Sequence, residues 1–364
     1  MTLPLMFHDT WLPLEDGTPL IVNTEPDDVT REAVLAYDFE WSGTSSFLPV
    51  RKPDVPADFS VGVIVGASGS GKTTLLREFG VPSHPAWDDR PIAAAFATAG
   101  EAAEKFYAVG LNSVPTWTRP YSVLSTGERF RADLARVLGT GTVVDEFTSV
   151  VDRHVAMSAS NALRRWAADR RIVVATCHRD VLPWLNPDWV IDLDTREWSV
   201  LPRDCLQRPN LVVEVREAKR SAWDIFRRHH YLNDGPLHPF ARCYLATIDN
   251  LAVGFSATIP FPNGHLRNAW RGHRTVVLPD YQGLGIGVRL SDFVAALHLK
   301  QGLRYFSRTS HPLMGRWRDA SPRWRATTSN HTRRRALARF GFNDEAGGTE
   351  RDTWSHEYVG SDKP

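Results

Sequence analysis

The hydrophobic positions of the chain follow two successive patterns. In the first half, short apolar runs predict buried strands with helical segments between them. The predicted strands are residues 61–65, 143–144 and 173–177, and the predicted helices are 74–79 and 129–138. Strands that alternate with helices predict an α/β domain.

The pattern changes after residues 198–210, which contain two prolines and no sustained period. We place a linker there and expect one domain over residues 1–205 and another over 206–364. The second half predicts strands at 211–215, 242–248, 252–258, 274–278 and 305–308, and helices at 221–229 and 288–300. Asp249 and Asn250 fit a hairpin turn between two of these strands. This order predicts an α+β domain.

Length and composition agree with two globular domains. A chain of 364 residues is longer than one hydrophobic core usually serves. Hydrophobic residues make up 42% and charged residues 23%, and no apolar segment approaches the roughly 18–20 residues of a membrane span. The N-terminal residues show no export leader, so we expect a cytoplasmic protein without a membrane partner. Cys177, Cys205 and Cys243 are too widely spaced for a disulfide framework or a Cys-rich zinc site.

Charge is unevenly distributed, although the net charge is only +1. Residues 304–339 contain ten arginines and one acid, Asp319, with Trp317 and Trp324 between them. Such a tract predicts nucleic-acid binding, since guanidinium groups pair with phosphates and indoles stack on bases. The alternative is a solvated face whose arginines pair with acids elsewhere.

A glycine-rich loop follows the first apolar run, with the sequence GASGSGKT at residues 66–73. Between a strand and a helix, the backbone N–H groups of such a loop can surround phosphate oxygens. Lys72 would neutralise the β- and γ-phosphates, and the Thr73 hydroxyl would bind Mg²⁺. We therefore expect ATP and Mg²⁺ as cofactors; the alternative is an ordinary surface loop. The predicted nucleotide-binding residues are Gly66, Ser68, Gly69, Gly71, Lys72, Thr73 and Thr74.

Two later strands end in polar residues that suit phosphate chemistry. The run 142–144 leads into Asp145 and Glu146, and the run 173–177 leads into His178. Asp145 would join Thr73 at the Mg²⁺ site, and Glu146 would act on the attacking water. His178 would reach the γ-phosphate.

The order of these segments resembles the motif series of the ABC-type ATPases over about residues 30–195. The series is the phosphate loop, LSTGE at 124–128, the acidic pair, SVVD at 149–152 and His178. The resemblance implies that Ser125 and Gly127 contact a γ-phosphate held by the other subunit, in an ATP-dependent head-to-tail homodimer. Glu146 would be the catalytic base and His178 the switch histidine.

The chain departs from the ABC pattern in three places. LSTGE replaces the usual LSGGQ, the interval from Lys72 to Ser125 is short, and no glutamine clearly takes the Q-loop role. A short interval without a membrane span favours an ABC protein that works on nucleic acid or as a regulatory switch. Adenine could stack on Tyr37, Phe39 or Trp41; the alternative is that these are core residues.

A second glycine turn, QGLGIG at 282–287, follows VVLP at 276–279 and opens a predicted helix. The Q-x-x-G-x-G arrangement resembles motif A of the GNAT acyltransferases, with residues 337–342 a looser match to a later helix. The resemblance implies that turn N–H groups hold the pyrophosphate of acetyl-CoA or another acyl-CoA. A surface turn is the alternative. The implied coenzyme residues are Val277, Gln282, Gly283, Gly285 and Gly287.

Catalytic candidates of the second domain come from position alone. His229, His230 and Tyr231 follow the first helix, and His311 follows the strand after the coenzyme helix. Histidine could deprotonate an attacking amine, and tyrosine could protonate the leaving thiolate. Solvent-facing or capping roles are the alternative. The His-His-Tyr-Leu segment is also similar to the DNA-modifying GNAT relatives typified by the phage Mu Mom protein.

These features predict an ATP-dependent acyltransferase that modifies a nucleobase amine; DNA is favoured over RNA, and the choice between them stays open. One alternative is an acetyltransferase of a small molecule, protein or aminoacyl-tRNA with an ATPase sensor. Another is an ABC-type repair or defence ATPase with a non-catalytic GNAT-like module. The acyl group, the acceptor atom and any additional metal such as iron stay open.

Overall fold

The computed structural model describes residues 11–37, 40–139, 141–202, 205–206, 208–230, 235–262, 264, 266–335 and 350–360. These residues form two compact units. Unit 1 takes the described residues of 1–90, 94–110 and 121–209, and unit 2 takes those of 91–93, 111–120 and 210–364. The division after Pro209 lies close to the expected boundary. The sequence did not predict that residues 91–93 and 111–120 belong to unit 2.

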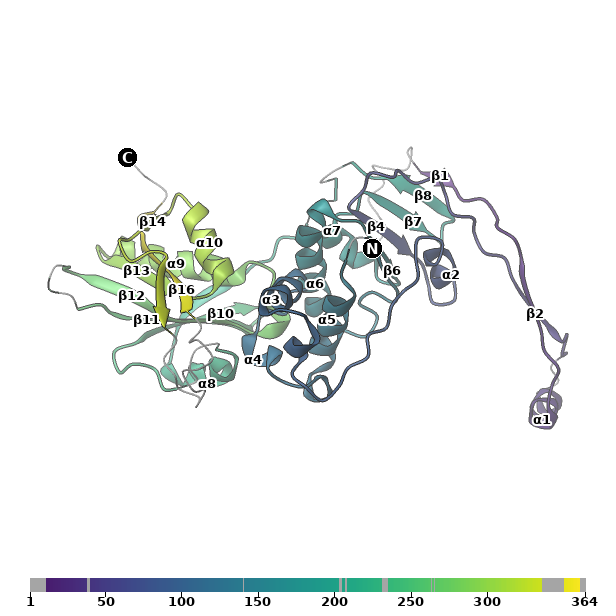
Figure 1. Cartoon of the computed structure of the whole chain (residues 1–364), viewed down its shortest axis with the longest axis horizontal. Coiled ribbons are helices and arrows are strands. Elements are labelled where there is room, and N and C mark those ends of the chain that lie inside the picture. The colour runs from purple at the N-terminus through teal and green to yellow at the C-terminus, as the bar shows by residue number, and fades with distance from the viewer. Residues whose placement is uncertain are drawn as a thin grey trace. The chain divides into compact units, whose positions relative to one another are not determined.

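Unit 1 is built around a six-stranded sheet (Figure 1). Its strands are β1 (Leu12–Pro13), β4 (Val61–Val65), β5 (Thr142–Val144), β6 (Ile172–Thr176), β7 (Trp189–Asp192) and β8 (Glu197–Val200), in the order β1-β8-β7-β4-β6-β5. Strands β7, β4, β6 and β5 are parallel, and β8 and β1 are antiparallel additions. Its helices are α2 (Lys72–Leu76), α3 (Ala99–Ala108), α5 (Thr126–Val137), α6 (Arg153–Trp166) and α7 (Leu182–Leu185).

The core of unit 1 packs around Trp189. All five residues of β4 are buried, as expected for a central parallel strand. Trp189 is fully buried and its ring packs against Phe59 and Phe79. A Cβ at Gly62 would lie 1.9 Å from the Trp189 ring, so only glycine lets β4 approach this indole.

The helix expected at 129–138 begins earlier, at Thr126. The Ser125 side chain accepts the Glu128 N–H, and the Glu128 carboxylate accepts the Ser125 N–H. This capping box satisfies two backbone donors that a helix start leaves without partners. The signature-like segment is therefore also a helix start.

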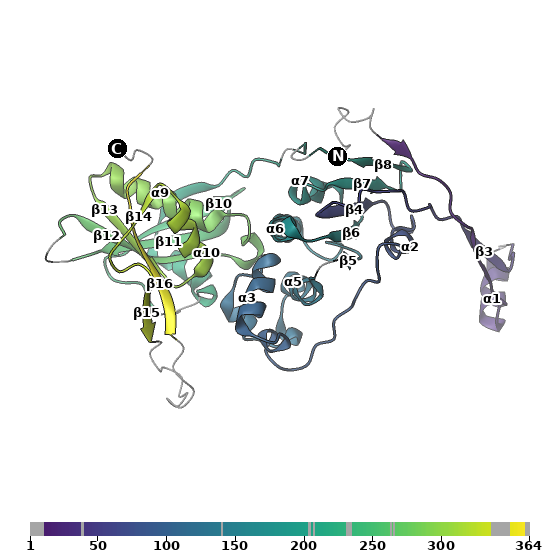
Figure 2. The same ribbon diagram turned by 45° about the horizontal axis from the view of Figure 1, so that its top comes forward.

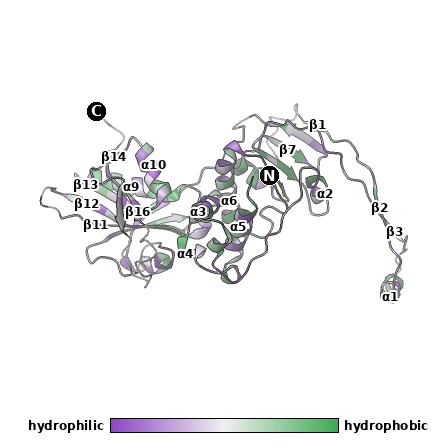
Figure 3. Cartoon of the chain, viewed as in Figure 1, coloured by the Kyte–Doolittle hydropathy of each residue, from purple (hydrophilic) through white to green (hydrophobic). Residues whose placement is uncertain are grey.

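A hairpin of β2 (Leu20–Asn23) and β3 (Thr44–Phe47) with helix α1 (Asp28–Ala36) precedes β4. Figure 3 colours β2 as hydrophobic, yet all four of its residues are exposed. Helix α1 has no buried residue. This segment contributes little to the core of unit 1.

Unit 2 contains a sheet in the order β14-β16-β13-β12-β11-β10-β9, and β15 also pairs with β16 (Figure 2). Its strands are β9 (Glu214–Ala218), β10 (Arg242–Ile248), β11 (Leu251–Pro260), β12 (Ala269–Val277), β13 (Arg304–Thr309), β14 (Trp324–Ala326), β15 (Thr332–Arg335) and β16 (Glu350–Tyr358). Its helices are α4 (Val114–Trp117), α8 (Trp223–Phe226), α9 (Ile286–Lys300) and α10 (Pro312–Ala320).

The two faces of this sheet carry separate hydrophobic clusters. On one face, here called the α9 face, Ile286, Leu290 and Val294 pack with Tyr244 and Tyr305. On the other, the α8 face, Trp223 and Phe226 pack with Leu237, Phe255 and Val276. Figure 1 shows α8 on the side opposite α9 and α10.

Strand β12 has different partners along its two edges. It pairs with β11 along its length, with an irregularity where Ala257 faces Arg274 and Thr258 faces Gly272. His273 is therefore an extra residue, a β-bulge. With β13, the recorded pairing is parallel and joins 269–271 to 304–306. Both strands continue beyond this pairing, so their adjoining edges part there.

Several predicted bounds are corrected by the structure. The strand predicted at 211–215 is β9 at 214–218, and the helix predicted at 221–229 is the short α8 between two 3-10 turns. The Asp249 and Asn250 turn is confirmed, since both residues have positive φ angles of 48° and 65°. No disulfide links the cysteines. Among the described residues, no helix is both long and apolar enough to span a membrane.

We expect Gly62→Ala to lower the free energy of unfolding of unit 1 by about 1–3 kcal/mol, because the new methyl group overlaps the buried Trp189 ring. Urea denaturation measures this change. Gly100→Ala is the matched control, since its Cβ would meet only the Thr98 hydroxyl, at 3.8 Å. Equal stability of both variants would contradict the packing described here.

Candidate functional site

The glycine-rich loop of unit 1 joins β4 to α2. The Lys72 ammonium donates to the carbonyl oxygens of Gly66 (2.9 Å) and Ala67 (2.6 Å), so it lies across its own loop. Gly69 and Gly71 have φ angles of 80° and 95°, which only glycine adopts without strain. The Ser70 hydroxyl is buried and has no partner among the described residues. These are properties of a loop that can surround an anion.

The ends of three parallel strands bring the acidic pair and His178 near this loop. The Thr73 hydroxyl donates to a carboxylate oxygen of Asp145 at 2.7 Å. Glu146 and Thr148 have φ angles of 47° and 66°, an unusual conformation for residues other than glycine. The Thr148 hydroxyl lies 3.3 Å from Nδ1 of His178. Strand β6 lies between β4 and β5, which places His178 at the same sheet edge as Lys72 and Asp145.

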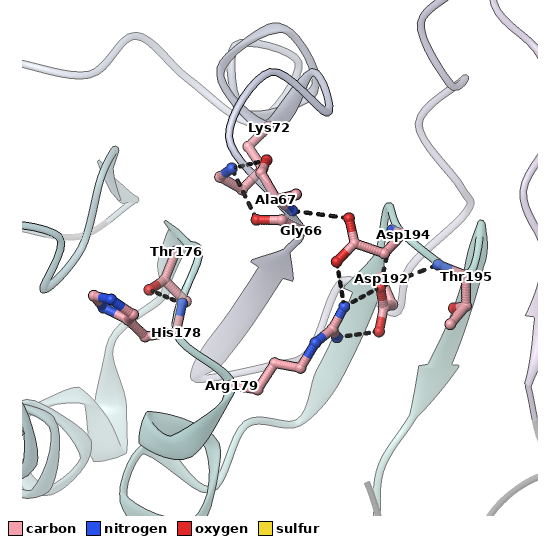
Figure 4. A network of polar contacts seen from close by, with 9 residues as sticks. All are labelled: Gly66, Ala67, Lys72, Thr176, His178, Arg179, Asp192, Asp194 and Thr195. Carbon is pink, nitrogen blue, oxygen red and sulfur yellow. Dashed lines mark hydrogen bonds and ion pairs between the residues drawn. The ribbon is translucent and has the colours of Figure 1, made fainter. Parts of the chain in front are cut away.

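A polar network connects the residue after His178 to the phosphate loop (Figure 4). The Arg179 guanidinium bonds both Asp192 and Asp194, at 2.6 Å from the latter. The Ala67 N–H donates to Asp194 at 2.8 Å. This bond, followed by the charge and hydrogen bond of Arg179, holds the pKa of Asp194 below its usual value. Sequence patterns did not reveal Arg179, Asp192 or Asp194.

Ser125 and Gly127 lie at the start of α5. The Ser125 side chain is bound in the capping box, and the Gly127 carbonyl accepts from the buried Arg131 side chain at 3.0 Å. Their contact with a second subunit stays a prediction.

The predicted stacking of adenine on Tyr37, Phe39 or Trp41 stays a prediction. Tyr37 is 85% exposed and Trp41 is 39% exposed, so the alternative that these two are core residues is wrong. Phe39 lies outside the described residues. The ring of Phe47 instead lies against the phosphate loop, 2.5 Å from the position a Gly71 Cβ would take. No sequence motif identified Phe47, the last residue of β3, as a candidate.

The glycine turn of unit 2 lies between β12 and α9. The Gln282 side-chain amide donates to the Val277 carbonyl at 2.9 Å, which ties the turn to the end of the strand. Gly283 and Gly285 have φ angles of 89° and 80°, and Gly285 caps the helix. A Cβ on Gly285 would meet nothing within 4 Å, whereas one on Gly287 would meet Val277 at 3.5 Å. Gln282 Oε1 is buried without a partner among the described residues.

The histidine candidates lie at separate places in unit 2. His230 is 8% exposed and packs edge-on against Trp223, while His229 accepts from the neighbouring Arg228 side chain at 3.1 Å. Tyr231 lies outside the described residues. His311 directly precedes α10; burial, followed by the charge of Arg318, lowers the pKa of His311 to about 4. The ring is therefore neutral at pH 7.

His273 was missed by the sequence analysis because a β-bulge has no sequence motif. Its Nε2 accepts from the His238 N–H at 3.4 Å. Burial, followed by the charges of Arg274, Arg271 and His238, lowers the pKa of His273 to about 4. Two further histidines therefore lie together in unit 2.

The arginine-rich tract is not one basic face. Trp324 is 3% exposed and donates to Asp292 at 2.8 Å, so the prediction that it stacks on a base is wrong. Arg318 is 3% exposed and lies over the Trp324 ring. Arg304 and Arg325 pair with Glu357, and Arg323 pairs with Asp292. The side chains of 333–335, and the whole of 337–342 with Arg339, lie outside the described residues.

No family model and no curated protein matches the chain. Among solved structures, it is similar to a GNAT-family acetyltransferase from Streptococcus pneumoniae, at 12% identity and a TM-score of 0.32 over 41% of this chain and 99% of that one. It is also similar to a Bacillus subtilis acetyltransferase in complex with CoA, at 14% identity and 0.29 over 41% and 99%. A GNAT acetyltransferase from Elizabethkingia anophelis with bound acetyl-CoA has 13% identity and 0.28 over 40% and 97%. At these TM-scores the similarities assign no activity.

Proposed function

We propose that the protein is an acyl-CoA-dependent N-acyltransferase joined to a P-loop ATPase of ABC type, and that its acceptor amine belongs to a nucleic acid. The observation that carries the acyltransferase is that β12 stops pairing with β13 after Arg271, on the strand that leads to the glycine turn. Each unit supports its own half of the proposal.

The opening between β12 and β13 suits the pantetheine arm of an acyl-CoA. The recorded pairing of β12 with β13 ends at Arg271, and both strands continue beyond it. Open strand edges can bind an extended chain that contains amides, as the arm does. At the end of β12, the turn and the start of the 15-residue helix α9 supply N–H groups for the pyrophosphate. Gln282 Oε1 could accept a hydrogen bond from the coenzyme.

The acyl transfer itself needs few groups. The acceptor nitrogen attacks the thioester carbon, a base takes the nitrogen proton, and the sulfur leaves and is protonated. His311 follows β13 and stays a candidate base, although its pKa of about 4 lies below the working pH at which a base is most effective. His229 and His230 stay candidates on the α8 side.

Unit 1 supports nucleotide binding through the same kind of backbone geometry. The Thr73 hydroxyl oxygen and an Asp145 carboxylate oxygen lie 2.7 Å apart. Both suit Mg²⁺, a hard cation that prefers oxygen ligands. Lys72 would turn from the loop carbonyls to the β- and γ-phosphates. Glu146 is exposed beside this pair and would orient the attacking water. His178 would contact the γ-phosphate, and Phe47 offers an aromatic face for the nucleotide.

Gly285→Asp should abolish acetyl-CoA binding, because a carboxylate would then stand in the open space where we place the pyrophosphate. Gly302→Asp is the control, since Gly302 follows the same helix with φ of 71° and equally open space. Each variant loses about 1 kcal/mol or more from the left-handed conformation. Isothermal calorimetry with acetyl-CoA distinguishes them. Equal binding by both variants, or none by the wild type, would refute the coenzyme site.

Glu146→Gln should form a stable dimer at saturating ATP and Mg²⁺, because nucleotide would bind without being hydrolysed. The Ser125 segment of each chain would then close on the Lys72 loop of the other. Light scattering measures the mass. Lys72→Ala is the paired variant, and we expect it to stay monomeric because it lacks the phosphate contact. A monomeric Glu146→Gln protein with ATP bound would disprove the head-to-tail dimer.

The nucleic-acid acceptor predicts affinity that falls steeply with salt. A protein that neutralises about three phosphates should give a log–log slope near −3 on duplex DNA. We expect fewer contacts than the ten arginines of the tract suggest, because Arg304, Arg318, Arg323 and Arg325 are buried or paired. Fluorescence anisotropy with and without ATP measures the slope. No binding at low salt would favour a small-molecule acceptor instead.

A further inference from the structure

The bulge in β12 leaves His273 outside the regular pairing of this strand with β11. Arg274 pairs with Ala257 and Gly272 pairs with Thr258, so His273 has no directly opposed residue on β11. It follows Arg271, the last residue paired with β13, by two positions. Bulges re-aim side chains and are frequent next to active sites. His273 thus lies at the mouth of the opening where the thioester is proposed to bind.

The contacts of His273 place it on the α8 face. The N–H of His238 donates to His273 Nε2 at 3.4 Å, and the preceding residue, Leu237, packs in the cluster of Trp223 and Phe226. The α9 face carries the coenzyme helix. An acceptor on the α8 face would approach the opening without competing with that helix for space.

Two arginines lie beside His273 on this part of the α8 face. Arg271 is exposed, and its guanidinium lies 5.4 Å from the centre of the Phe261 ring. Phe261 in turn packs against Phe306, the residue of β13 that pairs with Arg271. Arg274 donates to the His273 carbonyl at 3.1 Å. In the described part of the chain, Arg271 forms no ion pair with an acidic side chain.

We propose that His273 is the general base of the acyl transfer and that its acceptor is an amine bearing a phosphate, bound by Arg271 and Arg274 on the α8 face. This inference rests on the proposed acyl-CoA chemistry. It assigns a base that none of the sequence motifs identified. The phosphate could belong to a polynucleotide or to a free nucleotide.

The step is balanced without another reactant. The acceptor nitrogen forms a bond to the acyl carbon, the carbon–sulfur bond breaks, and the nitrogen proton passes to His273 Nε2. The leaving thiolate then takes up this proton from His273, which gives the free coenzyme thiol and returns the ring to its neutral form. The hydrogen bond from the His238 N–H to His273 Nε2 is long, at 3.4 Å. The N–H of the acceptor would replace the His238 N–H as the donor to Nε2.

The phosphate of the acceptor would change the pKa of His273. Burial and the charges of Arg274, Arg271 and His238 keep the His273 ring neutral. A base is most effective when its pKa lies near the working pH. A phosphate between the arginines would offset their charges and raise the pKa of His273. By linkage, protonation of His273 and phosphate binding favour each other.

The first test compares His273→Gln with His331→Gln, a control at an exposed histidine that contacts Asp319. The donor is acetyl-CoA, and the acceptors are a mixed-sequence single-stranded oligodeoxynucleotide, deoxynucleoside monophosphates and the corresponding deoxynucleosides. We expect kcat to fall about 10²- to 10⁴-fold in His273→Gln alone, with the Kd for acetyl-CoA unchanged. Wild-type kcat in this variant would overturn the inference and leave the proposed function intact. Absence of acetyl-CoA binding in the wild type would instead refute the proposed function.

The second test removes the positive charges one at a time. Arg271→Gln and Arg274→Gln should each raise KM about 10- to 100-fold for phosphate-bearing acceptors and leave KM for deoxynucleosides unchanged. Arg216→Gln, at an exposed position of β9, is the control. Equal effects on acceptors with and without phosphate would overturn the phosphate assignment. A higher kcat/KM on the oligodeoxynucleotide identifies a polymer acceptor, and a higher value on the monophosphates identifies a free nucleotide.

A third measurement does not depend on turnover. NMR titration should show the His273 pKa rising when a deoxynucleoside monophosphate is added, and staying unchanged with the deoxynucleoside. The His273→Gln variant identifies the resonance. A His273 pKa that does not respond to the monophosphate would contradict its place beside the phosphate.

Discussion

The pairing of β12 is the constraint on which the candidate site of unit 2 depends. One edge of this strand is bonded to β11, and the recorded pairing at the other edge joins it to β13 over three positions. The same strand ends at Val277, where the Gln282 side chain ties the glycine turn to it. The bulge at His273 lies between these two features. A single strand therefore positions the opening, the turn and the half-buried imidazole, and a shift of its register would displace all three.

In unit 1, the sheet edge sets the arrangement. Parallel strands deliver their carboxyl ends to one side, so Lys72, Asp145 and His178 converge although they are far apart in sequence. The Arg179 pairs with Asp192 and Asp194 add a connection from the end of β6 to the Ala67 N–H. The connection from Arg179, the residue after His178, to the phosphate loop therefore consists of one ion pair, with Asp194, and one hydrogen bond, from the Ala67 N–H to Asp194.

The sequence predicted what short, local patterns encode. The buried run at 61–65, the glycine loop, the Asp249 and Asn250 turn and the helix after Gly287 all depend on neighbouring residues, and all are present. Features that depend on contacts between distant segments could not be predicted from such local patterns. Phe47 meets Gly71 because a hairpin returns to the loop, and His273 stands out only because β11 is one residue shorter at that point. Neither leaves a pattern along the chain.

The arginine tract shows why composition is a poor guide to surface charge. Arg318 lies in the interior over Trp324, and Glu357 accepts both Arg304 and Arg325, so these side chains support the packing of β16, α10 and β14. Arg271, by contrast, stands outside the tract, forms no ion pair with an acidic side chain in the described part of the chain, and helps to keep the nearby His273 ring neutral. The charge of an arginine paired with a carboxylate is already neutralised. An arginine beside an imidazole instead lowers the pKa of that ring, and an anionic ligand would offset this effect. The functional cations of unit 2 are therefore expected where the strand pairing ends, not where arginine is most frequent.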